Sequence, residues 1–130
     1  MENVRIVIPG RPITKKNHSQ IVKRGNRTFL IPSKQYIAYE KLCGIYIGGV
    51  LKQNINTPIN LKCLYYMPTH HKVDLCNLLA ATCDILTKYD VIEDDNSNIV
   101  ISHDSSRVLY DKENPRVEIY IERIDDGTID

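Results

Sequence analysis

The chain has 130 residues, of which 42% are hydrophobic and 25% are charged, and its formal net charge is +1. This length suits one domain that buries its own core, and the composition is that of an ordinary globular protein. Because it has no run of 18 apolar residues and no basic-then-apolar leader, we expect neither a transmembrane span nor a signal peptide, and we expect a cytoplasmic protein.

The small net charge conceals a strong asymmetry along the chain. Residues 1–72 carry 12 Lys and Arg against 2 Asp and Glu, a balance of +10, whereas residues 73–130 carry 5 against 14, a balance of −9. A basic half attracts a phosphate backbone, and an acidic half can hold metal ions that offset its own repulsion. On charge alone, the two halves could equally neutralise each other after folding.

The spacing of apolar residues and turn signals predicts both strands and helices. In chain order these are a strand at 4–8, a hairpin tip at 23–27, a strand at 28–31, a helix to about 47, a strand at 59–67, a second helix of about three turns, and strands at 99–102, 107–109 and 117–121. Ser33 and Asp74 are well placed to cap the two helices, and Lys88 suits the negative end of the second. We therefore expect one α+β domain over residues 1–124, with a mixed or mostly antiparallel sheet and two main helices, followed by a frayed acidic tail at 125–130.

The four cysteines do not include a Cys-x-x-Cys pair. In a chain with no secretory signal this predicts reduced thiols that are mostly buried. Cys76 and Cys83 lie on one face of the second predicted helix with two histidines upstream. Their spacing fits no standard structural zinc pattern, so we favour core thiols over a zinc site.

The most informative stretch runs from Met67 to Asp95. It places Asp74 at the start of a helix and the acidic residues Glu93, Asp94 and Asp95 just past its end. Carboxylates arranged in this way suit Mg²⁺, which acts in proteins mostly on phosphates. This arrangement indicates a metal-dependent enzyme that acts on nucleic acid. Taken alone, a helix cap and a solvated acidic loop explain the same residues.

A second candidate site is basic. Lys15, Lys16, Lys23, Arg24 and Arg27 belong to a segment that ends in the hairpin tip. We expect them, with Asn17 and Lys72, to contact DNA phosphates, although a solvated surface is the default for such runs. Another pair, His103 and Asp104, follows a predicted strand, where a turn and a substrate contact are both open.

One set of residues between 67 and 100 keeps a fixed order and spacing. It consists of Met67-Pro68, Asp74-Leu75-Cys76-Asn77-Leu78, Asp84-Ile85-Leu86-Thr87-Lys88, Asp94-Asp95 and Val100. This set resembles the RusA family of Holliday-junction resolvases, whose hallmark is Asp-Leu-Asp-Asn-Leu, a helix that ends near Asp-x-Leu-Thr-Lys, and then Asp-Asp. The resemblance implies a RusA-like fold and a small endonuclease of the phage or prophage type. Such enzymes act as homodimers in recombination and repair, bind four-way DNA junctions, and nick two strands symmetrically with Mg²⁺ or Mn²⁺.

The resemblance also implies roles for individual residues. Asp74 and Asp95 match family aspartates and are implied to be catalytic metal ligands, with Asp94 as a catalytic helper. Two positions depart from the pattern, because Cys76 stands where the family usually has an aspartate and Ala80 where it has a lysine. Mg²⁺ prefers oxygen to sulfur, and a lysine would have stabilised charge on the phosphate. An alternative is therefore a protein that binds branched DNA with little or no catalysis, and a weaker one is a nuclease for flaps or single strands.

Overall fold

The structure is a computed structural model that describes residues 3–15 and 20–124. Its elements in chain order are β1 (Val4–Pro9), β2 (Gln20–Arg24), β3 (Arg27–Ile31), α1 (Lys34–Ile47), β4 (Ile59–Met67), α2 (Leu75–Lys88), β5 (Val100–Ser102), β6 (Arg107–Tyr110) and β7 (Arg116–Arg123). Every predicted strand and helix is present, and β2 completes the predicted hairpin by pairing with β3. The tail proposed at 125–130 lies outside the described residues.

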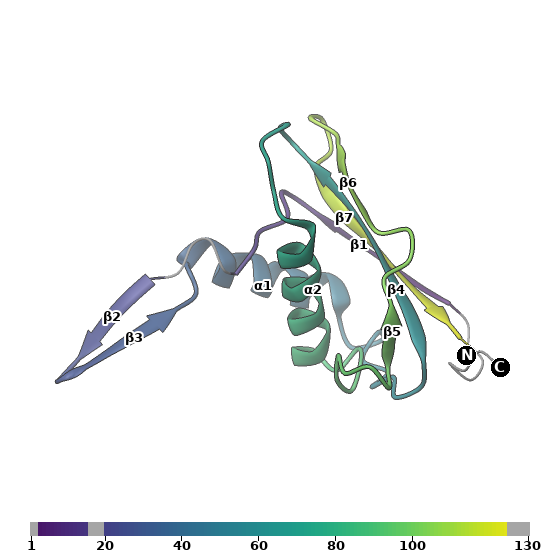
Figure 1. Cartoon of the computed structure of the whole chain (residues 1–130), viewed down its shortest axis with the longest axis horizontal. Coiled ribbons are helices and arrows are strands. Elements are labelled where there is room, and N and C mark those ends of the chain that lie inside the picture. The colour runs from purple at the N-terminus through teal and green to yellow at the C-terminus, as the bar shows by residue number, and fades with distance from the viewer. Residues whose placement is uncertain (1–2, 16–19, 125–130) are drawn as a thin grey trace.

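Five strands form one mixed sheet in the order β1-β7-β4-β5, and β6 also pairs with β4 (Figure 1). β7 is antiparallel to β1 and β4, whereas β5 and β6 are parallel to β4. β5 pairs with the beginning of β4 and β6 with its end, so they share one edge of β4, and the turn between them lies along the middle of that edge. The predicted α+β fold with a mixed sheet and two main helices is confirmed.

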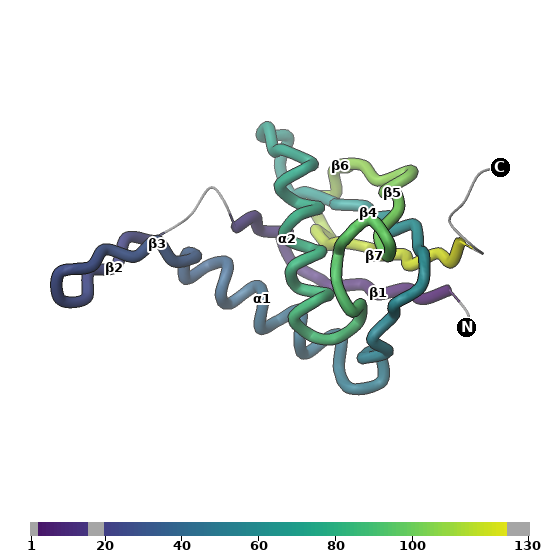
Figure 2. The backbone as a smooth tube through the Cα atoms, turned by 60° about the horizontal axis from the view of Figure 1, so that its bottom comes forward, coloured from purple at the N-terminus to yellow at the C-terminus, as the bar shows by residue number. Residues whose placement is uncertain are grey.

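Both helices lie on the same face of the sheet, and the β2–β3 hairpin projects from the body beyond the start of α1 (Figures 1 and 2). Strand alternation explains which face is covered, because Val117, Ile119 and Ile121 of β7 are all buried. The helices close this core with buried side chains such as Tyr36 of α1 and Leu86 of α2. Within residues 3–15 and 20–124, no helix is long and apolar enough to cross a membrane.

Specific polar contacts fix the position of α2 on the sheet. The hydroxyl of Thr82 donates to the carbonyl oxygen of Leu78 at 3.0 Å and lies 2.7 Å from the hydroxyl of Tyr65 on β4. Because the Thr82 proton is already used, Tyr65 donates to Thr82. At the other end of α2, Lys88 forms an ion pair with Glu40 of α1. These contacts fix the rotation of α2 about its own axis. They thereby decide which side chains of α2 lie near the loops that carry Asp95 and His103.

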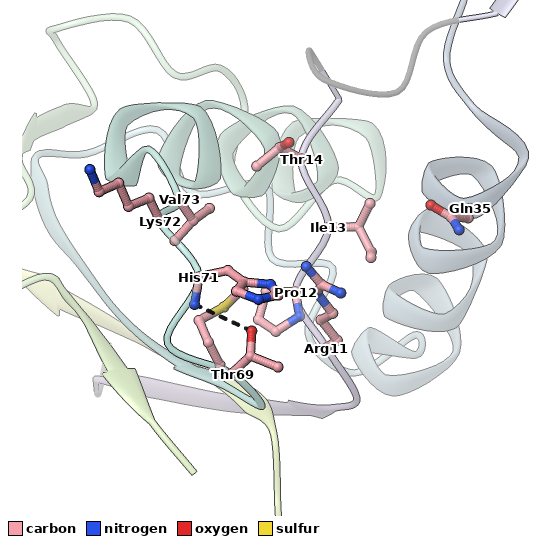
Figure 3. Close-up of a pocket in the computed structure, with 10 residues that line it drawn as sticks. Arg11, Pro12, Ile13, Thr14, Gln35, Thr69, His71, Lys72 and Val73 are labelled. Carbon is pink, nitrogen blue, oxygen red and sulfur yellow. Dashed lines mark hydrogen bonds between the residues drawn. The ribbon is translucent and has the colours of Figure 1, made fainter. Parts of the chain in front are cut away.

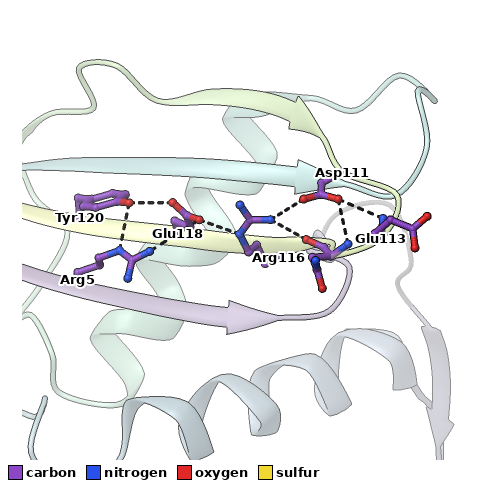
Figure 4. Close-up of polar contacts among 7 residues, drawn as sticks. Arg5, Asp111, Glu113, Arg116, Glu118 and Tyr120 are labelled. Carbon is purple, nitrogen blue, oxygen red and sulfur yellow. Dashed lines mark hydrogen bonds and ion pairs between the residues drawn. The ribbon is translucent and has the colours of Figure 1, made fainter.

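The opposite face of the sheet carries a connected polar network (Figure 4). Glu118 accepts hydrogen bonds from Arg116 at 2.7 Å and from the hydroxyl of Tyr120 at 2.8 Å. Arg116 also donates to Asp111 at 2.9 Å, and Arg5 donates to the Tyr120 hydroxyl at 3.2 Å. Burial raises the pKa of Glu118, but the hydrogen bonds from Arg116 and Tyr120 outweigh burial, so the pKa lies below its usual range. The carboxylate is therefore kept ionised against the sheet.

Candidate active site

The first aspartate of the predicted site, Asp74, caps α2. Its Oδ1 accepts a hydrogen bond from the backbone N–H of Cys76 at 2.9 Å, which confirms the predicted cap. The side chain is exposed, and Oδ2 has no hydrogen-bond partner among the described residues. Capping therefore uses one carboxylate oxygen and leaves the other open to a further ligand.

A pocket of about 280 Å³ lies against α2. The side chains that line it are Cys76, Leu79, Ala80, Cys83, Asp95 and His103. The four positions from α2 recur at intervals of three or four residues, which places them on one face of the helix. Cys76 and Ala80, the two departures from the family pattern, therefore share this pocket with Asp95.

Asp94 and Asp95 line different pockets. Asp95 belongs to the pocket against α2, whereas Asp94 lines a second one of about 450 Å³ with Glu93 and neighbouring asparagines. Asp94 accepts hydrogen bonds from the backbone N–H of Asp95 at 2.8 Å and from the side chain of Asn96 at 3.0 Å. These two bonds, the first being the stronger influence, lower the pKa of Asp94. Asp94 thus organises the loop that carries Asp95, and its catalytic part remains a prediction.

The arrangement suits a metal ion that is held jointly with substrate. Within the described ranges, no three His, Cys, Asp or Glu side chains are grouped closely enough to bind a metal by themselves. Mg²⁺ is usually held by one or two carboxylates together with water and substrate phosphates. Asp74 and Asp95 as its ligands stay a prediction, because Asp74 does not line the pocket that contains Asp95.

Burial, followed by the charges of Asp95 and Asp84, raises the pKa of Cys83 to about 12. Cys83 is therefore a protonated core thiol, as the sequence analysis favoured. The same prediction is wrong for Cys76, which is exposed because it lies in the first turn of α2, beside the capping residue.

A larger, basic pocket of about 540 Å³ lies where β1 and β4 end (Figure 3). Its lining residues are Arg11, Pro12, Ile13, Thr14, Gln35, Met67, Thr69, His71, Lys72 and Val73. β1 and β4 are both antiparallel to β7 and so run in the same direction, which brings the segments that follow them to one end of the sheet. Figure 3 shows Arg11 and His71 at the centre of the pocket, with Lys72 extending away from the other side chains.

The sequence analysis had named Lys72 for DNA contact but not Arg11 or His71. No local signal marks these two residues, because 60 positions of chain separate the two segments and only the pairing of β7 with both strands joins them. The pocket thus contains a basic group, Arg11, His71 and Lys72, next to the start of α2. His71 and Lys72 also come just before the capping residue Asp74 in the sequence.

The other predicted DNA contacts are spread over the molecule. Lys23, Arg24 and Arg27 are exposed at the tip of the projecting hairpin, away from α2 (Figure 1). Lys15 lies 3.9 Å from Asp84 of α2, and both side chains are 51% exposed, so this is a weak surface ion pair. Lys16 and Asn17 lie outside the described residues. The structure therefore offers two separate basic regions, one at the hairpin tip and one beside α2.

Comparison with known proteins identifies the family of the chain. A family model described as Endodeoxyribonuclease RusA matches residues 9–122, which is nearly the whole chain. The matched range includes both pockets beside α2 and the hairpin. A comparison with curated proteins gives no match.

Proposed function

Because the chain belongs to the RusA family of endodeoxyribonucleases, we propose that it resolves four-way DNA junctions by paired, symmetric nicks in a metal-dependent reaction. The observation that carries this proposal is the pocket that joins Asp95 to the helix capped by Asp74. A basic pocket adjoins the start of the same helix, so phosphate-binding groups stand next to carboxylates that lack cationic partners. The process served is DNA recombination and repair.

We assign the roles as follows. Asp74 and Asp95 hold Mg²⁺ or Mn²⁺ together with oxygens of the cleaved phosphate, and the bound metal supplies stabilisation of the charge that develops there. Asp94 keeps the Asp95 loop in place through the backbone hydrogen bond at 2.8 Å. Arg11 and Lys72 contact phosphates on the approach to the start of α2.

We also propose that the protein acts as a homodimer in which the hairpin covers a second copy of the chain. Ile21 and Leu30 on the hairpin are 76% and 73% exposed, and Phe29 in the middle of β3 is 43% exposed. An isolated two-stranded hairpin is marginally stable in water, so such a hairpin gains most from an apolar partner surface. A two-fold axis would place two identical sites on one junction, which suits symmetric nicking.

Sedimentation velocity tests the dimer. We expect the wild-type chain to sediment as a dimer and Leu30→Asp to shift it toward monomer, because a buried unpaired charge opposes association. Val50→Asp is the control, since Val50 is 89% exposed at the far end of α1. A monomeric wild-type protein, or an unchanged Leu30→Asp dimer, would contradict the proposed interface.

Cleavage of a labelled four-way junction in Mg²⁺, and separately in Mn²⁺, tests the main proposal. We expect paired nicks near the crossover, and we expect none from Asp74→Asn. The asparagine keeps the cap because its side-chain oxygen still accepts from the N–H of Cys76, so loss of cutting reports on the carboxylate and not on the helix. Cutting of flaps or single strands in preference to the junction would identify a nuclease of different substrate.

One observation favours a second candidate function, a junction-binding protein with little catalysis. Cys76 and Ala80 both line the pocket that contains Asp95, where an oxygen ligand and a cation would serve cleavage. A junction that is shifted in a gel but uncut in both metals would support this second function. Nicks that disappear in Asp74→Asn would exclude it.

A further inference from the structure

His103 is held in one orientation at the pocket that contains Asp95. Its Nδ1 lies 2.9 Å from the backbone carbonyl oxygen of Leu61 on β4. A carbonyl oxygen only accepts hydrogen bonds, so Nδ1 carries the ring proton and donates it. In the neutral ring Nε2 is then left with a lone pair. The half-buried ring also lines the pocket, and its Nε2 forms no hydrogen bond with any described residue, so this nitrogen is free to accept a proton.

The turn that carries His103 is anchored on both sides. Asn60, which is 8% exposed, accepts hydrogen bonds from the hydroxyl of Ser102 at 2.6 Å and from the N–H of Asp104 at 2.7 Å. Its amide group donates to the carbonyl oxygen of Asp104 at 3.2 Å. Ser106, which ends the turn, accepts from the backbone N–H of Cys63 at 2.9 Å. β4 thus fixes the residues before and after His103, as a reacting side chain requires.

We propose that His103 is a catalytic residue, the general base that takes a proton from the water attacking the phosphorus atom. The proposal rests on the nuclease function proposed above and adds a residue for which the sequence offered only a turn or a substrate contact. Its basis is the combination of a fixed Nδ1–H, an Nε2 with no hydrogen-bond partner among the described residues, and a pocket lined by both His103 and Asp95. The pocket holds about 280 Å³, which is room for a phosphate group with its attacking water.

The step conserves atoms and charge. The water oxygen forms a bond to phosphorus while Nε2 takes one of the water protons, and the bond from phosphorus to one bridging oxygen breaks. The departing oxygen takes a proton from solvent, and the imidazolium returns its proton to solvent. The net reaction is hydrolysis of one phosphodiester bond, and water is its only co-reactant.

Replacement by asparagine separates this chemistry from the structural contact. In His103→Asn the side-chain amide N–H occupies the place of Nδ1 and can still donate to the Leu61 carbonyl oxygen, whereas no group replaces Nε2. We expect single-turnover cleavage of a four-way junction at saturating Mn²⁺ to slow by about 100-fold or more. The junction Kd and the Tm should stay close to wild type. His70→Asn is the control, because His70 stacks on Tyr110 at 3.8 Å and does not line the pocket.

A second variant tests direct participation. His103→Gly opens space for a small base, and added imidazole should restore part of its cleavage rate. Wild-type cleavage with an unaffected His103→Asn would overturn the assignment and leave the nuclease function standing. Slow cleavage that imidazole does not restore, with a lowered Tm, would overturn it as well. An inactive wild-type protein in both metals would defeat the nuclease function and this inference with it.

Discussion

The polar network on the outer face of the sheet and the candidate site beside α2 differ in how their carboxylates are paired. On the outer face Arg116 binds both Asp111 and Glu118 and lies 3.8 Å above the ring of Tyr66. On the helical side, neither Asp74 nor Asp95 forms an ion pair with any described residue. Paired charges stabilise a fold, whereas the mutual repulsion of carboxylates without cationic partners is relieved when a cation binds. We therefore propose that the outer-face network serves stability and that Asp74 and Asp95 serve binding.

The largest expected effect is on the cleavage rate, and it distinguishes Asp95 from its neighbour Asp94. Asp95→Asn should lower the rate of junction cleavage by about 100-fold or more, because it removes a proposed metal ligand. Its Tm should be unchanged or slightly raised, because the side chain has no cationic partner to lose. Single-turnover cleavage and thermal melts measure the two quantities.

Asp94→Asn is the matched control for this pair. It should cost only a few-fold in rate, since an asparagine oxygen can still accept from the N–H of Asp95. Equal losses in the two variants would contradict the different pockets that the two side chains line. A large fall in the Tm of Asp95→Asn would contradict the division of the two faces.

The converse is expected on the outer face. Glu118→Gln removes the charge that Arg116 binds at 2.7 Å, so the free energy of unfolding should fall by about 1–2 kcal/mol. This corresponds to a Tm lower by about 3–8 °C at pH 7. Junction cleavage below the melting transition should be unchanged. A cleavage defect without a stability defect would remove the contrast between the faces.

The same variant should respond differently to acid. The pKa of Glu118 is lower in the folded protein than the value of about 4.3 for a free glutamate, so its contribution to stability is present above that pH and is lost as the pH falls through the folded pKa. The Tm difference between wild type and Glu118→Gln should therefore shrink as the pH falls below the ordinary glutamate pKa of about 4.3. A gap that stays constant would show that packing, and not ionisation, causes the difference.

The sequence predicted local features of this fold well. The predicted strand at 59–67 coincides with β4, and the caps at Ser33 and Asp74 are both formed, because alternation and capping depend on neighbouring residues. The projection of the hairpin from the body was not predictable, because a local pattern predicts the pairing of two strands but not their position relative to the rest of the fold. β2 itself was not predicted as a strand, because its residues Lys23 and Arg24 were assigned to the hairpin tip at 23–27.

The candidate site was predictable only where it is continuous in sequence. The positions around α2 follow from helical spacing, and the resemblance to the RusA family identified Cys76 and Ala80 as departures. Arg11 and His103 join their pockets through strand order and a turn anchored by Asn60, which no local pattern encodes. The split between Asp94 and Asp95 likewise depends on hydrogen bonds within the loop.

A variant that adds a carboxylate to the pocket beside α2 should gain activity, which tests the same site in the opposite direction. Cys76→Asp adds an oxygen ligand to the face of α2 that lines the pocket, so Mg²⁺-supported cleavage should rise by about 10-fold. The gain with Mn²⁺ should be smaller, because Mn²⁺ binds the ligands already present at least as tightly as Mg²⁺ does. Cys76→Ser, which supplies no carboxylate, is the control. No gain in either metal would argue that position 76 does not reach the metal.

The smallest expected effect concerns DNA affinity. Lys72→Ala removes one proposed phosphate contact beside α2, so junction affinity should fall only a few-fold at physiological salt, and the slope of log K against log[salt] should shrink by about 1. Lys52→Ala removes the same charge from an exposed position beyond the far end of α1. The two variants have equal net charge, so a general electrostatic attraction would lower their affinities and slopes alike. A smaller slope for Lys72→Ala alone would place the phosphate backbone at the carboxylate side of the molecule.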